Sequence, residues 1–338
     1  MGKSQERRSN LMDYSRCRQL HITPHSRIGL TPSVADVGSK KRLLRQPPSE
    51  LRECERRYVK LFEGTEKTEM NGEIHHLLLL ASYANMFLLK NILEIPKPYD
   101  NNKQYNVKFI KSKHRTILSR LVSGSVSFDT ISWFKDIKRR NCIGVKILNG
   151  RSTNDERITS AYVGGGRRWG IICLYNSTTE LWTPGWELES KPPNTKWEIT
   201  YNMSKLKFDI DSFNFNHSVN IDALSERLKI SLSNISKLAE EIGEVPWKDN
   251  FFDKGLKILE GKIVEENKLP NIYSNQAQRI VSAVYSAWVF GGMGSWNDSP
   301  PYSAHTHGKE TEFNLLSGNL YETMMDCIEG AINSLVTR

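Results

Sequence analysis

Residues 169–188 read WGIICLYNSTTELWTPGWEL, and this stretch decides the fold. Two runs rich in β-branched and aromatic residues, Trp169–Tyr175 and Glu180–Leu188, flank a short polar connector, as in paired strands. The short connector favours antiparallel neighbours, because parallel strands need a long crossover. Trp182 and Trp186 share one face of the second run if it forms an unbroken strand.

Further runs of this kind place the stretch in a larger sheet. Clusters of Gly, Asn, Pro and Ser separate them, and the expected strands are Tyr105–Ile110, Ile143–Leu148, Arg157–Val163, Lys196–Tyr201 and Leu206–Ile210. Two short helices are expected at His114–Val122 and Phe128–Ile137. This part of the chain therefore predicts a mixed domain with an antiparallel sheet.

From about residue 217 the apolar residues recur every three or four positions, which predicts helices. The expected helices are 217–242 (closed by Gly243), Trp247–Val264, Ser274–Phe290 and Phe313–Leu335. Four amphipathic helices in so short a segment pack naturally as a bundle. The predicted fold class is α+β, a mixed domain with an antiparallel sheet followed by a C-terminal helical bundle. The predicted segments are a basic, disordered tail at 1–48, the α+β domain with a Trp-rich sheet at 49–212, and the bundle at 213–338.

The helix expected at Ile74–Leu93 is apolar on all sides. The overlapping stretch Leu77–Ile95 is barely long enough to span a bilayer, and it contains Asn85, Lys90 and Asn91, which are costly in hydrocarbon. We therefore interpret it as the buried central helix of the first domain. His75 and His76 at its start are interpreted as a helix end rather than a ligand pair.

The composition is that of an ordinary globular protein. Of 338 residues, 38% are hydrophobic and 25% charged, which excludes collagen, a coiled-coil rod and a disulfide miniprotein. The five cysteines form no Cys-x-x-Cys pair and indicate reduced thiols. We find no secretory signal pattern and expect a cytoplasmic protein without a membrane partner.

Positive charge is concentrated in two segments. Residues 1–60 hold 14 Lys and Arg against 6 Asp and Glu, and residues 103–146 hold 11 against 2. Such segments attract phosphate backbones or acidic proteins. One interpretation is nucleic-acid binding, with candidate residues Lys111, Lys113, Arg115, Lys138, Arg139 and Arg140. The alternative is that these segments dock on the acidic second half of the chain or are simply solvated.

A glycine-rich segment between two expected strands is the best single candidate for a ligand site. Its residues are Gly165, Gly166, Arg167, Arg168 and Trp169. Successive backbone N–H groups and two guanidinium groups suit a phosphate or a carboxylate. The alternative is a glycine hairpin turn whose arginines face water.

The most distinctive motif is Gly-Gly-Met-Gly-Ser-Trp-Asn-Asp at 291–298, directly after an expected helix. Phosphate-binding loops place their glycines before a helix, so we interpret this motif as a structural helix stop with a tight reversal. The residues given this role are Gly291, Gly292, Gly294, Trp296, Asn297 and Asp298. Trp296 is expected to fold back onto the bundle, and Asn297 and Asp298 to cap backbone N–H groups.

Together with Glu-Glu-Ile-Gly-Glu-Val-Pro-Trp at 240–247, this motif resembles a group of small helical domains of unknown function in bacterial proteins. In those domains the loop usually reads Gly-Gly-Met-Gly-Ser-Phe-Asn-Asp. The resemblance covers about residues 219–338 and implies a bacterial source and a helical fold, with no assigned reaction. Some domains of this type are similar to immunity or partner-neutralising proteins. After the motif, Ser299–Tyr302 departs from the apolar continuation of the family.

His305 and His307 follow the motif on a Pro-rich segment that we expect to be a loop. Imidazoles and nearby carboxylates are zinc ligands, but a His-x-His pair on such a loop is typically exposed. We therefore predict no metal and no cofactor. The chain also lacks His-Glu-x-x-His, Gly-x-Ser-x-Gly and Rossmann glycine motifs, which favours a protein that is not an enzyme.

The leading hypothesis is a non-enzymatic bacterial protein that binds a protein partner, in an immunity or conflict setting. The Trp-rich sheet supports it, because Trp is enriched among residues that dominate binding energy. One alternative is a nucleic-acid-binding protein that uses residues 1–60 and 103–146. Another is an enzyme with an interdomain pocket that involves Arg167, Arg168 and His305.

Overall fold

The computed structural model of the chain describes residues 72–94, 105–112, 125–150, 156–157, 159–161, 168–191, 194–205, 219–266, 268–291 and 294–336. These residues belong to one compact unit, Gly64–Arg338. The predicted tail, the helix at His114–Val122, the strand at Leu206–Ile210 and the predicted boundary after residue 212 lie outside the described residues.

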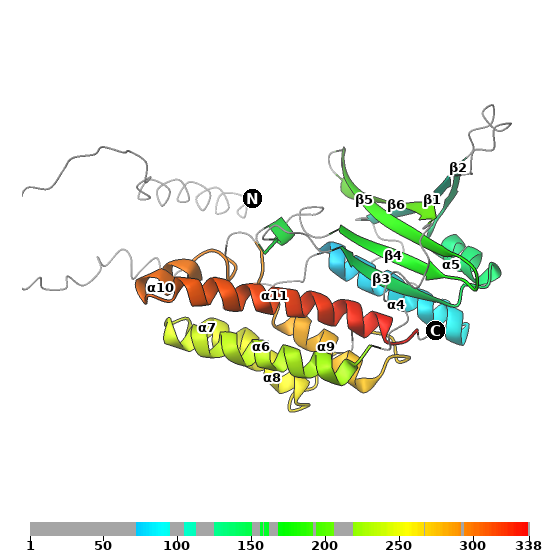
Figure 1. Cartoon of the computed structure of the whole chain (residues 1–338). Helices are drawn as coiled ribbons and strands as arrows, with labels where there is room; N and C mark the ends of the chain where they lie inside the picture. Colours follow the sequence, from blue (N-terminus) through cyan, green and yellow to red (C-terminus); the bar gives the residue numbers. More distant parts are fainter. Residues whose placement is uncertain are drawn as a thin grey trace, which may run out of the picture. The chain divides into compact units, whose positions relative to one another are not determined.

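The described strands form one sheet in the order β2-β1-β6-β5-β4-β3 (Figure 1). Their bounds are β1 (Tyr105–Ser112), β2 (Ser125–Phe128), β3 (Gly144–Gly150), β4 (Arg168–Leu174), β5 (Thr179–Lys191) and β6 (Asn194–Lys205). Each neighbouring pair is antiparallel except β1 and β6, which run parallel. The sheet is therefore mixed. The long chain segment between β1 and β6 supplies the crossover that a parallel pair needs.

The stretch that decides the fold forms β4, a tight turn and β5, as predicted. β5 continues through Pro184, which is paired with Tyr201 of β6. β4 pairs only with residues 179–182, so the missing N–H of Pro184 breaks no bond to β4. Trp182 and Trp186 consequently share one face of the strand and pack against the core.

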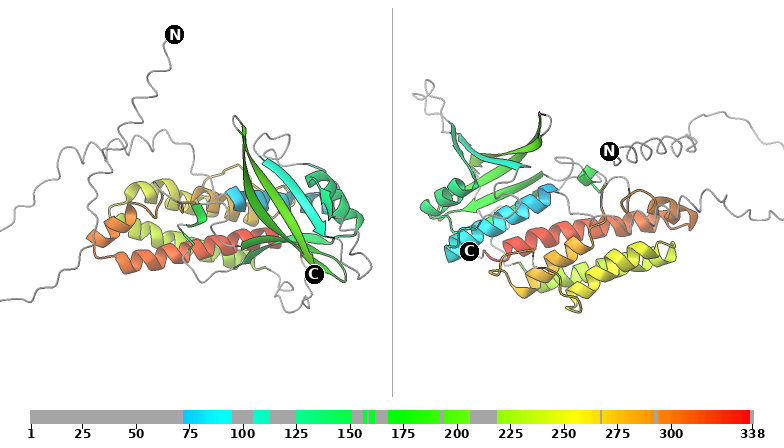
Figure 2. Two further views of the ribbon diagram at one scale, coloured as in Figure 1. Left: turned by 90° about the horizontal axis from the view of Figure 1, so that it is seen from above. Right: turned by 180° about the vertical axis from the view of Figure 1, so that it is seen from behind.

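The helices pack on the sheet and against one another (Figures 1 and 2). Their bounds are α4 (Gly72–Lys90), α5 (Thr130–Arg139), α6 (Ile221–Glu241), α7 (Val245–Trp247), α8 (Asp253–Leu259), α9 (Asn275–Ser286), α10 (Pro300–Thr306) and α11 (Glu310–Asn333). α5 contacts β1 and β2, whereas α4 contacts β3, β4 and α11. The sheet and the C-terminal helices share one hydrophobic core, and the α+β class is confirmed.

In the first half of the chain, two elements of the structure differ from those predicted from the sequence. The helix expected from Phe128 begins at Thr130, because the Asp129 side chain caps it by accepting from Ser132 N–H at 2.7 Å. The preceding residues form the edge strand β2 instead. The strand expected at Arg157–Val163 is wrong, since Thr159–Ala161 form a 3-10 turn. Hydroxyl groups there bond to nearby carbonyls and stabilise the turn.

In the C-terminal part of the chain, two further elements differ from those predicted from the sequence. The expected helix Trp247–Val264 is divided into α7, a π-helical turn at Lys248–Phe252 and α8, which is followed by Gly261 at a φ of +71°. The Pro-rich loop expected after the glycine motif is the helix α10. Its prolines occupy the first positions of the helix, where no N–H is needed.

α4 is the buried helix predicted at Ile74–Leu93. Within the described ranges, no helix combines the length and the apolar character needed to cross a bilayer. The Asn85 amide bonds both the N–H and the C=O of Val145 on the edge strand β3, each at 2.8 Å. The Asn333 amide of α11 does the same for Ile147, at 2.8 and 2.9 Å. Two side-chain amides thus imitate a neighbouring strand and close this edge of the sheet.

The first turns of α4 carry two buried or half-buried histidines. His75 Nδ1 contacts the hydroxyl of Tyr285 on α9, and His76 Nδ1 lies 2.9 Å from the hydroxyl of Tyr201 on β6. Burial and the nearby Lys268 charge lower the pKa of His75 to about 4. Burial and the neighbouring His75 lower the pKa of His76 to about 3. Both imidazoles are therefore neutral near pH 7 and link α4 to the sheet and to the helices.

Candidate functional site

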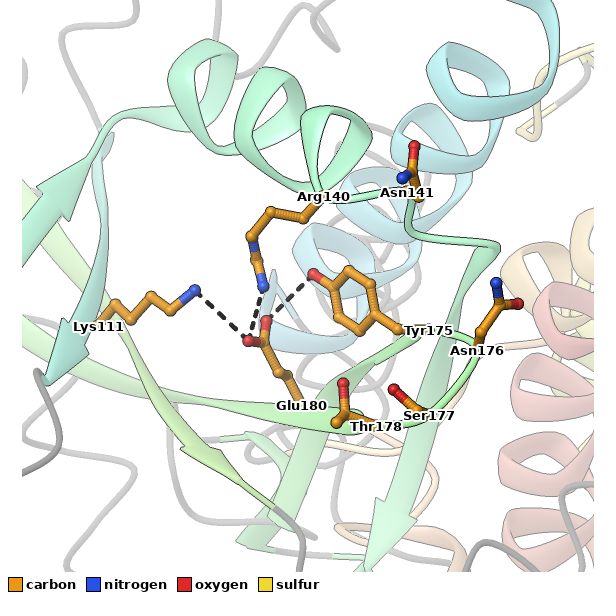
Figure 3. Close-up of a pocket in the computed structure, with 8 residues that line it drawn as sticks. All are labelled: Lys111, Arg140, Asn141, Tyr175, Asn176, Ser177, Thr178 and Glu180. Atoms are coloured by element: carbon orange, nitrogen blue, oxygen red, sulfur yellow. Dashed lines mark hydrogen bonds and ion pairs between the residues drawn. The ribbon is translucent and has the colours of Figure 1, made fainter.

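A polar pocket lies where α5 ends and the β4–β5 turn begins (Figure 3). Its volume is about 380 Å³, and its lining residues are Lys111, Arg140, Asn141, Tyr175, Asn176, Ser177, Thr178 and Glu180. They come from the end of β1, the C-terminal end of α5, the β4–β5 turn and the start of β5. The volume lies in the range of about 300–1,000 Å³ typical of small-ligand sites.

Two tight turns shape the walls of this pocket. Asn141 follows α5 at a φ of +57°, a left-handed conformation that Asn tolerates better than most residues. The next N–H, that of Cys142, donates to the carbonyl of Ile137 at 3.0 Å and closes the helix end. On the opposite wall, the Tyr175 N–H donates to the Thr178 carbonyl at 3.0 Å. Both walls are thus fixed by backbone hydrogen bonds.

Glu180 is the centre of the side-chain network in the pocket (Figure 3). Its Oε1 accepts from Arg140 Nη1 at 2.7 Å, and its Oε2 accepts from the Tyr175 hydroxyl at 3.1 Å. Lys111 Nζ lies farther from Oε1, at 3.5 Å. Arg140 Nε also donates to Asp136 at 2.7 Å, and its guanidinium lies 4.8 Å from the centre of the Tyr175 ring. Arg140 is therefore held on three sides.

The charged groups of the pocket lie in two layers. The side chains of Lys111 and Arg140 are 27% and 22% exposed, whereas those of Glu180 and Asp136 are 5% and 6% exposed. A ligand that enters the pocket would meet the two cations first. Glu180 pairs with both cations, and Asp136, which is not a lining residue, pairs with Arg140 and with Arg139.

Burial and neighbouring charges shift the pKa values of two side chains that line the pocket, Arg140 and Tyr175. Burial alone would lower the pKa of Arg140, but its hydrogen bond to Glu180 and the surrounding negative charges outweigh burial and raise it. Burial, together with the nearby cysteines and Glu180, raises the pKa of Tyr175 well above its usual value. Arg140 therefore stays charged and Tyr175 stays neutral at physiological pH.

The residues predicted to bind nucleic acid separate into different environments. Lys111 and Arg140 converge on the pocket, and Lys113 and Arg115 lie outside the described residues. Lys138 instead donates to the Asn91 side chain at 2.6 Å and to a main-chain carbonyl of α4. Arg139 pairs with a carboxylate of its own helix at 2.7 Å. Lys111 and Arg140 thus line the pocket, Lys138 is bonded to α4, and Arg139 shares its carboxylate, Asp136, with Arg140.

The glycine-rich ligand candidate is described only at its end. Gly165, Gly166 and Arg167 lie outside the described residues. Arg168 begins β4 and is exposed, whereas Trp169 is buried in the core. In the described part of this segment, one residue is therefore an exposed cation and the other is a packing residue of the core.

The glycine motif at 291–298 makes its described contacts within the fold. Gly294 has a φ of +76°, and its N–H donates to the Asp298 carboxylate at 2.8 Å. Gly291 has no left-handed φ, and its carbonyl accepts from the Ser295 hydroxyl at 3.0 Å. Gly292 lies outside the described residues. Of the described glycines of the motif, Gly294 is the one in the left-handed conformation that a tight reversal requires.

The two residues between Ser295 and Asp298 join the motif to distant segments. Trp296 is buried against Phe252 and Phe313, and its Nε1 donates to Ser317 of α11 at 2.8 Å. The Asn297 amide donates to the carbonyl of Arg157 at 3.0 Å, so it bonds a carbonyl rather than the expected backbone N–H. These contacts are those of a structural motif that fixes the chain between α9 and α10.

The two histidines after the motif belong to the exposed end of α10. His305 pairs with Glu310 at 3.1 Å, and His307 Nδ1 lies 2.7 Å from the carbonyl of Ser303. The part of the chain that the structure describes contains no group of three or more His, Cys, Asp or Glu residues arranged to hold a metal ion.

Sequence reasoning missed most of the pocket, because Tyr175, Glu180, Asn141 and the polar turn carry no recognisable motif. One signal was present at Glu180. Its spacing of two and six residues from Trp182 and Trp186 places it on the same, apolar face of β5. A carboxylate on such a face needs a buried cation, and the basic run at the end of α5 supplies it.

Comparison of the chain with protein-family models, with curated proteins and with solved structures finds no match. The resemblance of residues 219–338 to bacterial helical domains therefore stays a prediction.

Proposed function

We propose that this chain is a non-enzymatic binding protein that recognises a protein partner through the pocket at the end of the sheet. The main support is the rim of the pocket, where Asn141, Asn176, Ser177 and Thr178 are all exposed. Backbone hydrogen bonds hold both turns that carry them. A preorganised rim of donors and acceptors lowers the entropy lost on binding.

Two side chains of the pocket, Arg140 and Tyr175, are suited to binding rather than to acid–base chemistry near neutral pH. General acids and bases work best when their pKa lies near the operating pH. The pKa values of arginine and tyrosine side chains already lie well above neutrality, and those of Arg140 and Tyr175 are raised further, so each group has one protonation state near pH 7. They supply fixed charge and fixed hydrogen-bond donors, which a recognition site needs.

A protein partner is favoured over a nucleic acid because several described cations of residues 103–146 are paired with carboxylates of the fold. Nucleic-acid binding relies on several cations that face successive phosphates. Lys108 pairs with Glu198, and Arg139 pairs with Asp136. The nucleic-acid and enzyme alternatives predict different outcomes in the experiment below.

The test uses a photo-crosslinking amino acid, p-benzoylphenylalanine, in place of Asn176. The matched control carries it in place of Asn234, an exposed residue of α6. We expect a discrete protein adduct from the Asn176 position in cells of the source organism and none from Asn234. The same adducts from both positions, or none from either, would contradict the proposal. A nuclease-sensitive adduct would favour the nucleic-acid alternative, and a covalently altered small metabolite would favour the enzyme.

We extend the proposal to a bacterial immunity or conflict setting. This extension rests only on the resemblance of residues 219–338 to small helical domains of bacterial proteins. A toxin or nuclease gene next to this one, whose product forms the Asn176 adduct, is the expected finding. An adduct with an unrelated housekeeping protein would contradict this extension and leave the binding function in place.

A further inference from the structure

We propose that the pocket binds a carboxylate of the partner, an Asp or Glu side chain in an acidic peptide segment. This inference rests on the proposed function and assigns its ligand chemistry. It begins from the exposure of the charged side chains: Lys111 and Arg140 are 27% and 22% exposed, whereas Glu180 and Asp136 are 5% and 6% exposed. The accessible side of the pocket therefore favours an anion.

Lys111 is the residue that contacts the incoming carboxylate. Its ammonium carries three donors, and its described ion pair is the long contact of 3.5 Å to Glu180. If Lys111 turns to a ligand, Glu180 keeps its shorter bonds to Arg140 and Tyr175, at 2.7 and 3.1 Å. The movement therefore leaves no buried carboxylate without a donor.

Arg140 acts as a positioning residue. Its Nε and Nη1 already donate to Asp136 and Glu180, and its plane lies against the Tyr175 ring. The guanidinium cannot offer its usual two-pronged face to a phosphate without breaking these bonds. It contributes positive charge and holds Glu180 in place behind Lys111.

The remaining lining groups suit a singly charged, planar ligand. The hydroxyls of Ser177 and Thr178 and the amides of Asn141 and Asn176 are neutral donors at the rim. One mobile ammonium with neutral donors matches the single charge of a carboxylate. A volume of about 380 Å³ is large enough for one acidic side chain.

The test is a titration of the full chain followed by the NMR signals of the backbone amides of residues 176–178. The probes are N-acetyl-glutamate N-methylamide, its glutamine counterpart and inorganic phosphate. We expect saturable shifts with the glutamate probe, weakening as salt is raised, and none with the glutamine probe. Equal binding of the glutamine probe would overturn the inference, and tighter binding of phosphate would overturn the choice of a carboxylate.

Variants separate direct contact from a structural effect. Lys111→Gln should weaken binding of the glutamate probe about tenfold, since it removes one charge-assisted hydrogen bond. Lys135→Gln removes an exposed cation of α5 and should change the affinity less than about twofold. The double variant Ser177→Ala/Thr178→Val, which leaves the Glu180 network intact, should also weaken binding. Unchanged affinity in Lys111→Gln, with its thermal unfolding unchanged, would overturn the assignment.

The two proposals fail in different ways. If the Asn176 crosslink forms and Lys111→Gln leaves it unchanged, partner binding stands and the carboxylate site is wrong. If the glutamate probe binds and no protein adduct forms, the carboxylate site stands and the partner-binding function is wrong.

Discussion

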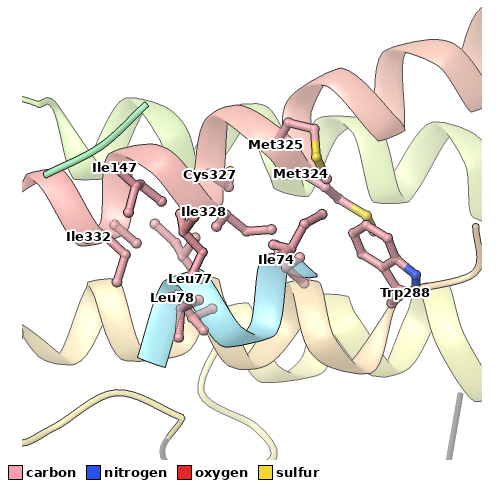
Figure 4. Close-up of a cluster of buried hydrophobic side chains, with 14 of the residues drawn as sticks. Ile74, Leu77, Leu78, Ile147, Trp288, Met324, Met325, Cys327, Ile328 and Ile332 are labelled. Atoms are coloured by element: carbon pink, nitrogen blue, oxygen red, sulfur yellow. The ribbon is translucent and has the colours of Figure 1, made fainter. Parts of the chain in front are cut away.

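The edge of β3 and the pocket at the end of the sheet use polar side chains in opposite ways. At the edge, the Asn85 and Asn333 amides each bond both backbone groups of one strand residue. Apolar side chains of α4, β3 and α11, among them Ile147 and Ile328, surround this edge and exclude water (Figure 4). At the pocket, Lys111 makes a long contact and reaches solvent.

This difference distinguishes polar side chains that stabilise the fold from polar side chains that can bind a ligand. A buried amide with all its partners in the fold stabilises the fold and has no capacity left for a ligand. A half-exposed ammonium with one long contact adds little to stability and can bind an incoming group. The comparison therefore predicts that substitutions at the edge of β3 change stability, whereas substitutions at the rim of the pocket change binding.

The largest effect on stability is expected from Asn333→Leu. The substitution preserves volume but leaves the N–H and C=O of Ile147 without partners in a dry site. Each such group costs about 1–3 kcal/mol, so we expect a loss of about 4 kcal/mol in the free energy of unfolding. Urea unfolding measures it, with Asn234→Leu on exposed α6 as the control, expected to change by less than about 0.5 kcal/mol. Equal stability of the two variants would remove the structural side of the comparison.

Acid should destabilise the protein through the histidines of α4. Their pKa values of about 4 and about 3 in the folded state lie below the value near 6.5 of the unfolded chain. The unfolded state therefore binds more protons as the pH falls below 6.5, and stability decreases toward pH 4. Between pH 8 and pH 5 we expect a loss of about 2 kcal/mol per histidine.

Urea unfolding of the single variants His75→Gln and His76→Gln should each show a shallower pH dependence, and the double variant the shallowest. An unchanged pH dependence in the double variant would mean that other groups cause the acid sensitivity. The pocket provides the contrast, because Arg140 keeps its charge over the whole of this range.

Glu180→Gln is expected to change both the stability of the protein and its binding of the ligand. The variant keeps a polar group near Arg140 and Tyr175 but removes the buried negative charge, so we expect a loss of about 1.5 kcal/mol in stability. Because the internal competitor of an incoming carboxylate is gone, affinity for the glutamate probe should rise. Glu187→Gln, an exposed position of the same strand, is the control for both measurements. Lower affinity in Glu180→Gln would show that Glu180 orients the ligand rather than competing with it.

Much of the fold could be predicted from local patterns. Runs of β-branched and aromatic residues located β1, β3, β4, β5 and β6, a segment apolar on all sides located α4, and the three-to-four residue period located α6, α9 and α11. The parallel pairing of β1 with β6 could not be predicted, because it depends on which strands meet after the crossover. The closure of the β3 edge by Asn85 and Asn333 was equally hidden, since it joins positions 60 and 186 residues away from their partners.

The pocket was the least predictable feature. Lys111 and Arg140 attracted attention as members of a basic segment, but their role depends on Glu180, which lies 40 residues beyond Arg140. Net charge in a sequence segment does not reveal which cations the fold neutralises. Of the two residues that precede Arg140 in the sequence, Lys138 bonds the Asn91 side chain, whereas Arg139 shares Asp136 with Arg140.

The smallest effect on stability is expected from Lys111→Gln, and it is the most informative for the comparison. Lys111 is 27% exposed and lies 3.5 Å from Glu180, which retains its bonds to Arg140 and Tyr175 when Lys111 is neutralised. We therefore expect a change below about 0.5 kcal/mol in urea unfolding, equal to that of Lys135→Gln. A loss above about 1.5 kcal/mol would place Lys111 with the structural amides of the β3 edge. In that case the accessible cation is needed to hold Glu180, and the pocket cannot release it to a ligand.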